Sequence, residues 1–200
     1  MQKPKSPLKA ALLVILALVV VAVVVGFFLP SQFAVSRSEQ VNAPPEAIYP
    51  FVASPKKWAD WSAWNPKVKP EFAFSYEGPD AGPGARLRLS DGKGGRGSGT
   101  LTIAEGDPKK GIHYVVELEN GFQIHGSIEL EATATGTKVT WTDRGEMSNP
   151  MMRYFIFTMD RMLGGAFEQG LKDLKKQVES PPAAPAQAPA APATAAPATP

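Results

Sequence analysis

The acid–base candidates that we single out in this 200-residue sequence are His113, His125, Tyr76, Tyr114 and Asp143. The histidines, His113 and His125, fall in neighbouring runs, "GIHYVVELENG" and "FQIHGSIELEA", in which apolar and polar residues alternate. Such alternation predicts a hairpin with one buried face and one wet face. A three-residue turn at 120–122 keeps the apolar residues together and places Glu129 opposite His113 and Glu117 opposite His125. We therefore expect both histidines to be surface residues on the wet face rather than metal ligands or catalytic bases.

The inward face of the predicted sheet holds the other candidates. Alternation along "GTKVTWTDRG" turns Trp141 and Asp143 inward, where Tyr114 also points. A carboxylate inside a sheet needs a partner or a solvated cavity, so Asp143 either lines a pocket or lies at the rim beyond its strand. The hydroxyls of Tyr76 and Tyr114 could orient a ligand. The sequence pairs no base with a nucleophile and contains no metal-ligand cluster or cofactor motif, so we assign no catalytic residue, no metal and no cofactor.

Tryptophan is concentrated in the short segment "WADWSAWNP", which holds three of the four tryptophans. Trp58 and Trp61 are three residues apart and would share one face of a short helix, with Trp64 near its end. The indoles could close one end of the core as a plug, form a portal to a cavity, or anchor the domain at a membrane surface, where tryptophan is enriched. The plug is the interpretation that we favour.

Positioning these side chains requires one sheet and one long helix. The pattern predicts a strand at 33–43, short helices at 45–53 and 54–64, about six antiparallel strands between 71 and 145, and a long helix at 150–178. Apolar residues recur at helical spacing along the last segment, so Met159 and Leu163 face the sheet. A strongly curved sheet wrapped around the long helix would bury every apolar face at once.

An apolar segment of 20 residues, Ala10 to Leu29, precedes this domain and contains no charged side chain. At about 1.5 Å per residue a helix of this length crosses roughly 30 Å of hydrocarbon. Lysines precede it at positions 3, 5 and 9, so the positive-inside bias keeps residues 1–9 in the cytoplasm. We expect residues 10–30 to be a single-pass transmembrane anchor in the inner membrane of a bacterium, with the domain periplasmic or extracytoplasmic. A cleavable signal peptide, with Ala-Val-Ser at 34–36 as its cleavage site, is the alternative.

The other end of the chain, residues 181–200, contains only Pro, Ala, Thr and one Gln. It lacks the apolar bulk to fold, so we expect a disordered, extended spacer; a docking ligand for a partner is the alternative. Residues 31–180 remain as one domain of ordinary size. The formal net charge of +2 leaves no basic excess for nucleic-acid binding, and nothing in the sequence indicates an oligomeric state.

Several blocks of this domain resemble the polyketide-cyclase/START-like superfamily, often abbreviated SRPBCC. The blocks are "VNAPPEAIYPFVASPKKWADWSAWNP", "GPDAGPGARLRL", "GSGTLTI", "GTKVTWTDRGE" and "MDRMLGGAFEQGLKDLKKQVE", within residues 33–179. The resemblance implies the α+β helix-grip fold, a curved antiparallel sheet wrapped around a long C-terminal helix, here preceded by one transmembrane helix. It also implies an apolar or amphipathic molecule held between sheet and helix, since some members are cyclases or aromatases and others carry lipids or hormones. The family shares no catalytic motif, so the resemblance assigns no catalytic residue.

Together these observations predict a membrane-tethered domain that binds a hydrophobic small molecule or lipid without catalysis. Apolar pockets with a few polar groups are typical of such sites. A cyclase- or dehydratase-like enzyme using the same cavity is one alternative, and an envelope protein-interaction domain with a filled core is another. The predicted cavity between the long helix and the sheet is lined by Tyr76, Leu89, Leu101, Tyr114, Trp141, Asp143, Met159 and Leu163, with Trp58, Trp61 and Trp64 as its portal or plug.

Overall fold

One sheet and one long helix dominate the computed structural model, which describes residues 7–65, 67, 70–92 and 98–180. The predicted Pro/Ala-rich tail, 181–200, and the first six of the predicted cytoplasmic residues lie outside the described residues. The helices are α1 Pro7–Phe28, α2 Pro45–Val52, α3 Trp58–Trp61, the 3₁₀ helix η1 Met152–Phe155 and α4 Ile156–Glu179. The strands are β1 Gln32–Val41, β2 Ala73–Glu77, β3 Arg86–Ser90, β4 Gly99–Asp107, β5 Gly111–Leu118, β6 Gln123–Thr133 and β7 Gly136–Glu146.

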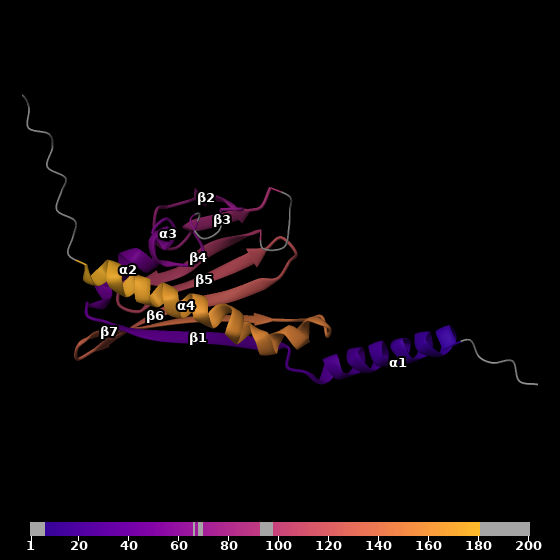
Figure 1. The fold of residues 1–200 in the computed structure, drawn as a ribbon. Coiled ribbons are helices and arrows are strands. Elements are labelled where there is room, and N and C mark those ends of the chain that lie inside the picture. Colours follow the sequence, from indigo (N-terminus) through magenta and orange to yellow (C-terminus); the bar gives the residue numbers. More distant parts are fainter. Residues whose placement is uncertain (1–6, 66, 68–69, 93–97, 181–200) are drawn as a thin grey trace, which may run out of the picture.

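The seven strands form one antiparallel sheet in the order β1-β7-β6-β5-β4-β3-β2. Strands β2 to β7 each pair with the next strand along the chain, and β1 closes the sheet by pairing with β7. The helix α4 packs along β1 on the face that carries the buried side chains, which we call the inner face (Figure 1). A sheet packed on a long C-terminal helix is the helix-grip fold, so this prediction from the sequence is confirmed.

The turn between β5 and β6 corrects one detail of the predicted hairpin. The turn has three residues, as predicted, but it spans 119–121 rather than 120–122, because the N–H of Leu118 donates to the carbonyl oxygen of Phe122. Gly121 has φ of 81°. A three-residue hairpin loop commonly ends in a left-handed residue, which glycine adopts without strain, so Gly121 takes the last position of the turn. The correction shifts the cross-strand partners along β6 but keeps every side chain on its predicted face.

The C-terminal helix begins differently from the prediction. The predicted helix at 150–178 is a 3₁₀ turn, η1, followed by α4, and the backbone N–H of Met151 donates to Oδ1 of Asn149 at 2.9 Å just before it. A side-chain acceptor of this kind satisfies a donor that the first turn leaves unpaired. Further along α4, Phe167, Leu171 and Leu174 are fully buried against the inner face. Their spacing of three and four residues is what the sequence pattern predicted.

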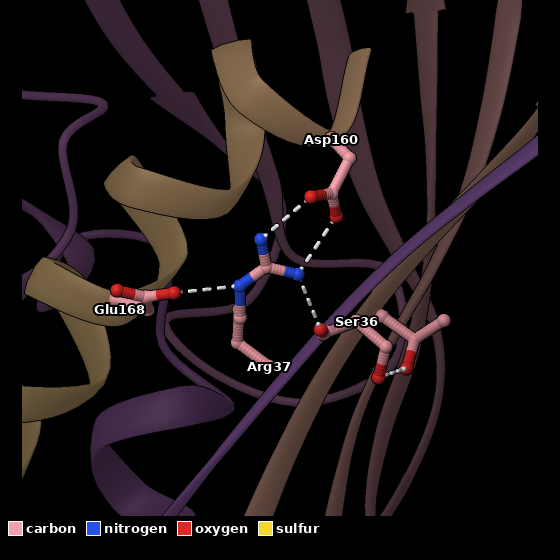
Figure 2. Close-up of polar contacts among 5 residues, drawn as sticks. Ser36, Arg37, Asp160 and Glu168 are labelled. Carbon is pink, nitrogen blue, oxygen red and sulfur yellow. Dashed lines mark hydrogen bonds and ion pairs between the residues drawn. The ribbon is translucent and has the colours of Figure 1, made fainter. Parts of the chain in front are cut away.

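A cluster of charged side chains joins α4 to β1 (Figure 2). Arg37 of β1 donates from Nε to Glu168 at 2.8 Å, and its Nη1 and Nη2 donate to the two carboxylate oxygens of Asp160 at 2.8 and 3.0 Å. The two acids hold the pKa of Arg37 further above its usual value, Asp160 contributing most. Gly164 lies one turn from each acid, and a Cβ placed there would collide with the guanidinium. The bare backbone at Gly164 therefore lets the arginine lie across the helix and bind both acids.

The N-terminal helix α1 is apolar and exposed and extends away from the sheet (Figure 1). Its segment Leu8–Phe28 has 21 residues, which is long and apolar enough to cross a membrane. A signal sequence near an N-terminus has the same length and composition. The structure thus shows an apolar helix of spanning length in the place where the sequence predicts an anchor.

Candidate functional site

One end of the inner face is filled by five buried rings. We call them the aromatic cluster: Trp58, Trp61, Tyr114, Trp141 and Phe167. Trp141 of β7 stacks on Phe167 of α4 with ring centroids 4.3 Å apart, and Trp58 of α3 meets both Trp141 and Tyr114 edge-on. The indole N–H groups of Trp58 and Trp61 donate to backbone carbonyls at the end of α2, so no polar atom of either ring is left without a partner. Rings from four elements therefore close the space between sheet and helix at this end.

A chain of side-chain hydrogen bonds runs across the sheet next to these rings. The hydroxyl of Tyr114 donates to Oδ1 of Asp143 at 2.6 Å and accepts from Nε1 of Trp141 at 2.6 Å. Tyr114 of β5 pairs with Gly126 of β6, which in turn pairs with Asp143 of β7. A Cβ at Gly126 would collide with the tyrosine ring. The ring lies over the glycine, and this is how a tyrosine reaches an aspartate two strands away.

Burial shifts the pKa values of both Tyr114 and Asp143. Desolvation raises the pKa of Asp143 to about 6, and the hydrogen bond from Tyr114 opposes that rise. The pKa of Tyr114 lies well above its ordinary value, first because the ring is buried and second because of the charge on Asp143. At neutral pH the carboxylate is therefore charged and the tyrosine is protonated. Both hydrogen-bonding roles of the hydroxyl are already filled within the protein.

The opposite end of the inner face, next to α1, is buried less completely, although Phe33, Leu87 and Leu101 are buried there. Phe33, which follows α1 closely, pairs with Gly145, and the same row continues through Ile124 and Val116. Ile124 and Val116 are half-buried, whereas the next row along the sheet, which contains Tyr114, is buried throughout. The half-buried apolar side chains at this end are Phe74, Tyr76, Leu89, Val116, Phe122 and Ile124.

The side chains of α4 are also less completely buried at the same end. Its N-terminal half contributes Ile156, Met159 and Leu163 to the core, and all three are half-buried. Its C-terminal half contributes residues that are buried completely, such as Leu171 and Leu174. We call the half-buried side chains of both layers the near-end surface: Phe74, Tyr76, Leu89, Val116, Phe122, Ile124, Ile156, Met159 and Leu163. The near-end surface and the aromatic cluster thus occupy opposite ends of one inner face.

The two histidines lie on the outer face, as predicted, and both are exposed. Ser127 lies opposite His113 and Val115 lies opposite His125, so the predicted pairs with Glu129 and Glu117 are wrong. An open hollow of about 380 Å³ is lined by both histidines and Glu105, among others, and a second hollow of about 30 Å³ lies beside β2 and β3. No set of three His, Asp or Glu in the described part of the chain is arranged to hold a metal.

The eight predicted cavity residues fall into two environments. Three are buried in or beside the aromatic cluster, namely Tyr114, Trp141 and Asp143, and Leu101 is buried in the row of Val116. The other four belong to the near-end surface, namely Tyr76, Leu89, Met159 and Leu163. Of the predicted plug or portal, Trp58 and Trp61 are buried, whereas Trp64 is 37% exposed. Val116, Phe122 and Ile124 were not among the site residues predicted from the sequence, although the alternation of the hairpin already turned Val116 and Ile124 inward.

The curved sheet, the long helix α4 packed on it and the apolar inner face define a helix-grip domain. Residues 32–179 match the family described as polyketide cyclase / dehydrase and lipid transport, and the chain belongs to this family. Family and fold together indicate binding of a hydrophobic ligand. A comparison with curated proteins found no match.

Solved structures share the fold at low sequence identity. Protein CV1439 from Chromobacterium violaceum is 18% identical, with a TM-score of 0.52, and the match covers 76% of this chain and 100% of that chain. A protein of unknown function from Staphylococcus aureus, SA2116, is 12% identical, with a TM-score of 0.54, and the match covers 74% of this chain and 94% of that chain. An uncharacterised protein from Rhizobium leguminosarum is 16% identical, with a TM-score of 0.51, over 74% of this chain and 95% of that chain. These likenesses concern the fold alone.

Proposed function

We propose that this chain is a membrane-anchored protein that binds an apolar small molecule or a lipid on the near-end surface. Incomplete burial of the inner face carries this proposal. Large apolar side chains of both the sheet and α4 remain half-exposed at one end, while the other end is filled with rings. A ligand that covered them would remove apolar area from water, which stabilises a complex by about 25 cal/mol per Å².

The polar groups near this surface suit an amphipathic ligand. Asp143 keeps 8% of its surface exposed, and its row of the sheet adjoins the row of Ile124 and Val116. Pockets for small molecules are typically apolar with a few polar groups that fix the orientation of the ligand. We therefore assign Asp143 as the group that orients a ligand hydroxyl or amine at the boundary between the two ends.

Anchoring by α1 is the second part of the proposal. The helix exposes apolar side chains along its length and has the 21 residues that a bilayer requires. Its C-terminal end leads directly into β1, so an anchored domain would sit against the membrane surface with the near-end surface closest to it.

The enzymatic alternative finds less support in the arrangement of Tyr114. Its hydroxyl already donates to Asp143 and accepts from Trp141, and the residue is 2% exposed. A general acid must reach the atom that receives its proton, within about 3 Å or through one water. The pair is therefore better suited to hold the sheet together than to carry out acid–base catalysis.

Native mass spectrometry tests the binding proposal. The full chain, extracted from its own membranes in a mild detergent, should carry an additional mass of a lipid or apolar small molecule. Leu89→Asp places a charge on the near-end surface and should remove most of that bound mass. Ser75→Asp introduces the same charge on the neighbouring strand, at an exposed position of the outer face, and should leave binding intact. Equal loading of the two variants, or a wild-type chain without any bound molecule, would contradict the proposal.

A further inference from the structure

Exposed apolar side chains gather where the C-terminal helix begins. Among the described residues of the domain, the large hydrophobic side chains that are exposed are Trp64 and six others in or next to η1 and the first turns of α4. We call the six the apolar lip: Met151, Met152, Tyr154, Phe155, Phe157 and Met162. Phe157 and Met162 are each 66% exposed. A contiguous set of this kind marks an interaction surface, whereas single exposed apolar residues are ordinary.

The apolar lip lies beside the last turns of α1. The hydroxyl of Tyr154 donates to the carbonyl oxygen of Ala22 at 2.8 Å. The guanidinium of Arg153 donates from Nη1 to the carbonyl oxygens of Phe27 at 3.1 Å and Leu29 at 3.4 Å. The last carbonyls of a helix have no partner within it, and a cation there also interacts favourably with the helix dipole. Arg153 thus caps α1 and holds η1 against it.

The contact of Tyr154 with Ala22 fixes the depth of η1 relative to α1. Ala22 precedes Phe28, the last residue of the helix, by six positions, which is about 9 Å along the axis at about 1.5 Å per residue. Helices that lie in a membrane surface bury their apolar face about 5–10 Å into the boundary between headgroups and acyl chains. Tyr154 and the η1 end of the apolar lip therefore lie at interfacial depth when α1 crosses a bilayer.

The charged side chains of this segment are compatible with the same environment. Residues 151–162 contain three ionisable groups besides the tyrosine, namely Arg153, Asp160 and Arg161. Asp160 is bound by Arg37, and Arg153 is bound to α1. Arg161 is exposed and forms no ion pair with any residue that the structure describes. Its long side chain can reach the phosphate of a lipid headgroup while its methylene groups stay among apolar atoms.

We propose that the apolar lip is immersed in the interface of the lipid bilayer that α1 crosses, so that the near-end surface opens towards lipid. This inference rests on the proposed anchoring by α1. The near-end surface occupies the sheet end that follows α1, and Ile156 and Met159, which belong to it, alternate along α4 with Phe157 and Met162 of the apolar lip. An apolar molecule can then pass from the bilayer to the inner face without crossing water.

Site-specific fluorescence in membranes tests this placement. The chain contains no cysteine, so each introduced cysteine is a unique attachment site. The full chain carrying Phe157→Cys or Met162→Cys is labelled with a nitrobenzoxadiazole probe and reconstituted in vesicles of phosphatidylcholine and phosphatidylglycerol. Lipids with a nitroxide near the top of the acyl chain should reduce the emission of both probes about twofold, because interfacial side chains lie at that depth. Lys172→Cys, an exposed position further along α4, is the matched control and should not be quenched.

A probe at Val19→Cys, near the middle of α1 and read with lipids that carry the nitroxide near the end of the acyl chain, separates the two proposals. If Val19 is quenched while Phe157 and Met162 report water, the anchor stands and the interfacial placement of the apolar lip is overturned. If Val19 itself is not quenched, anchoring by α1 fails, and the inference built on it fails too. Probes at Phe157 and Met162 that are shielded from water but not quenched by lipid would assign the apolar lip to a protein partner or a second copy, which also overturns the proposal.

Discussion

The aromatic cluster and the near-end surface belong to one sheet and one helix, yet they differ in how completely they are packed. At the first end, rings from α3, β5, β7 and α4 converge, and each indole N–H has a partner. At the other end, the apolar side chains that the sheet and α4 contribute remain half-buried. The comparison indicates that stability resides at one end and that ligand binding is free to use the other.

The largest expected effect follows from removing a ring of the aromatic cluster. Trp58→Ala should lower the free energy of unfolding by about 3–5 kcal/mol, because the ring is buried and contacts three other rings, so its removal leaves a cavity. Leu89→Ala on the near-end surface should cost about 1 kcal/mol, because the side chain is half-exposed already. Urea unfolding followed by circular dichroism measures both values. Equal losses would show that the two ends are packed alike and would remove the basis of the comparison.

The carboxyl group of Asp143, at the boundary between the two ends, should make the free energy of unfolding depend on pH. The pKa of Asp143 is raised from 3.8 to about 6 in the folded chain, so the folded state binds this proton more tightly than the unfolded state does. The contribution of Asp143 to the free energy of unfolding is most favourable below pH 4. It is lost as the pH rises through 6, by about 2–3 kcal/mol in all. Asp143→Asn keeps an acceptor for Tyr114 but cannot ionise.

Unfolding measured at several pH values checks this prediction. The free energy of unfolding of the wild-type chain should fall between pH 4 and pH 7 relative to that of the Asp143→Asn variant. Parallel curves for the two proteins would show that Asp143 ionises in the folded chain as easily as it does in water. Asp143 would then be more hydrated than its exposed fraction of 8% indicates.

The smallest effect concerns two adjacent glycines on α4. Gly165 has open space around it, so Gly165→Ala should stabilise the chain by about 0.5–1 kcal/mol through helix propensity. Gly164→Ala should not show this gain, because its Cβ would displace Arg37 from Asp160 and Glu168. Comparing the unfolding midpoints of the two variants measures the difference. An equal gain from both would mean that the ion-pair cluster does not fix the helix on β1.

Much of the fold could be predicted from the sequence because its periodicity is local. Alternation in the strands and the spacing of Phe167, Leu171 and Leu174 identify the sheet and the long helix without any tertiary information. The partners across the β5–β6 hairpin were predicted wrongly, because the position of one left-handed glycine, Gly121, decides them. Periodicity indicates which face a residue occupies, but it does not indicate how far that face is filled.

The site was less accessible to sequence reasoning for the same reason. Whether Trp141 lines a cavity or fills one depends on Trp58 and Phe167, which come from distant parts of the chain. The contact of Tyr154 with Ala22 joins residues 132 positions apart, and no local pattern in the sequence predicts it. Side chains of the right type were identified, but the division of the inner face into a filled and a half-buried end is a property of the assembled layers.

Photolabelling in membranes tests whether an apolar ligand covers the near-end surface. The full chain in its own membranes would be exposed to a fatty acid carrying a diazirine in its acyl chain, irradiated, digested and analysed by mass spectrometry. Labels are expected on the peptides that contain Val116 to Ile124 and Ile156 to Leu163, in addition to those on α1. Labelling confined to α1 would show that lipid meets the anchor only, and the binding site proposed here would be contradicted.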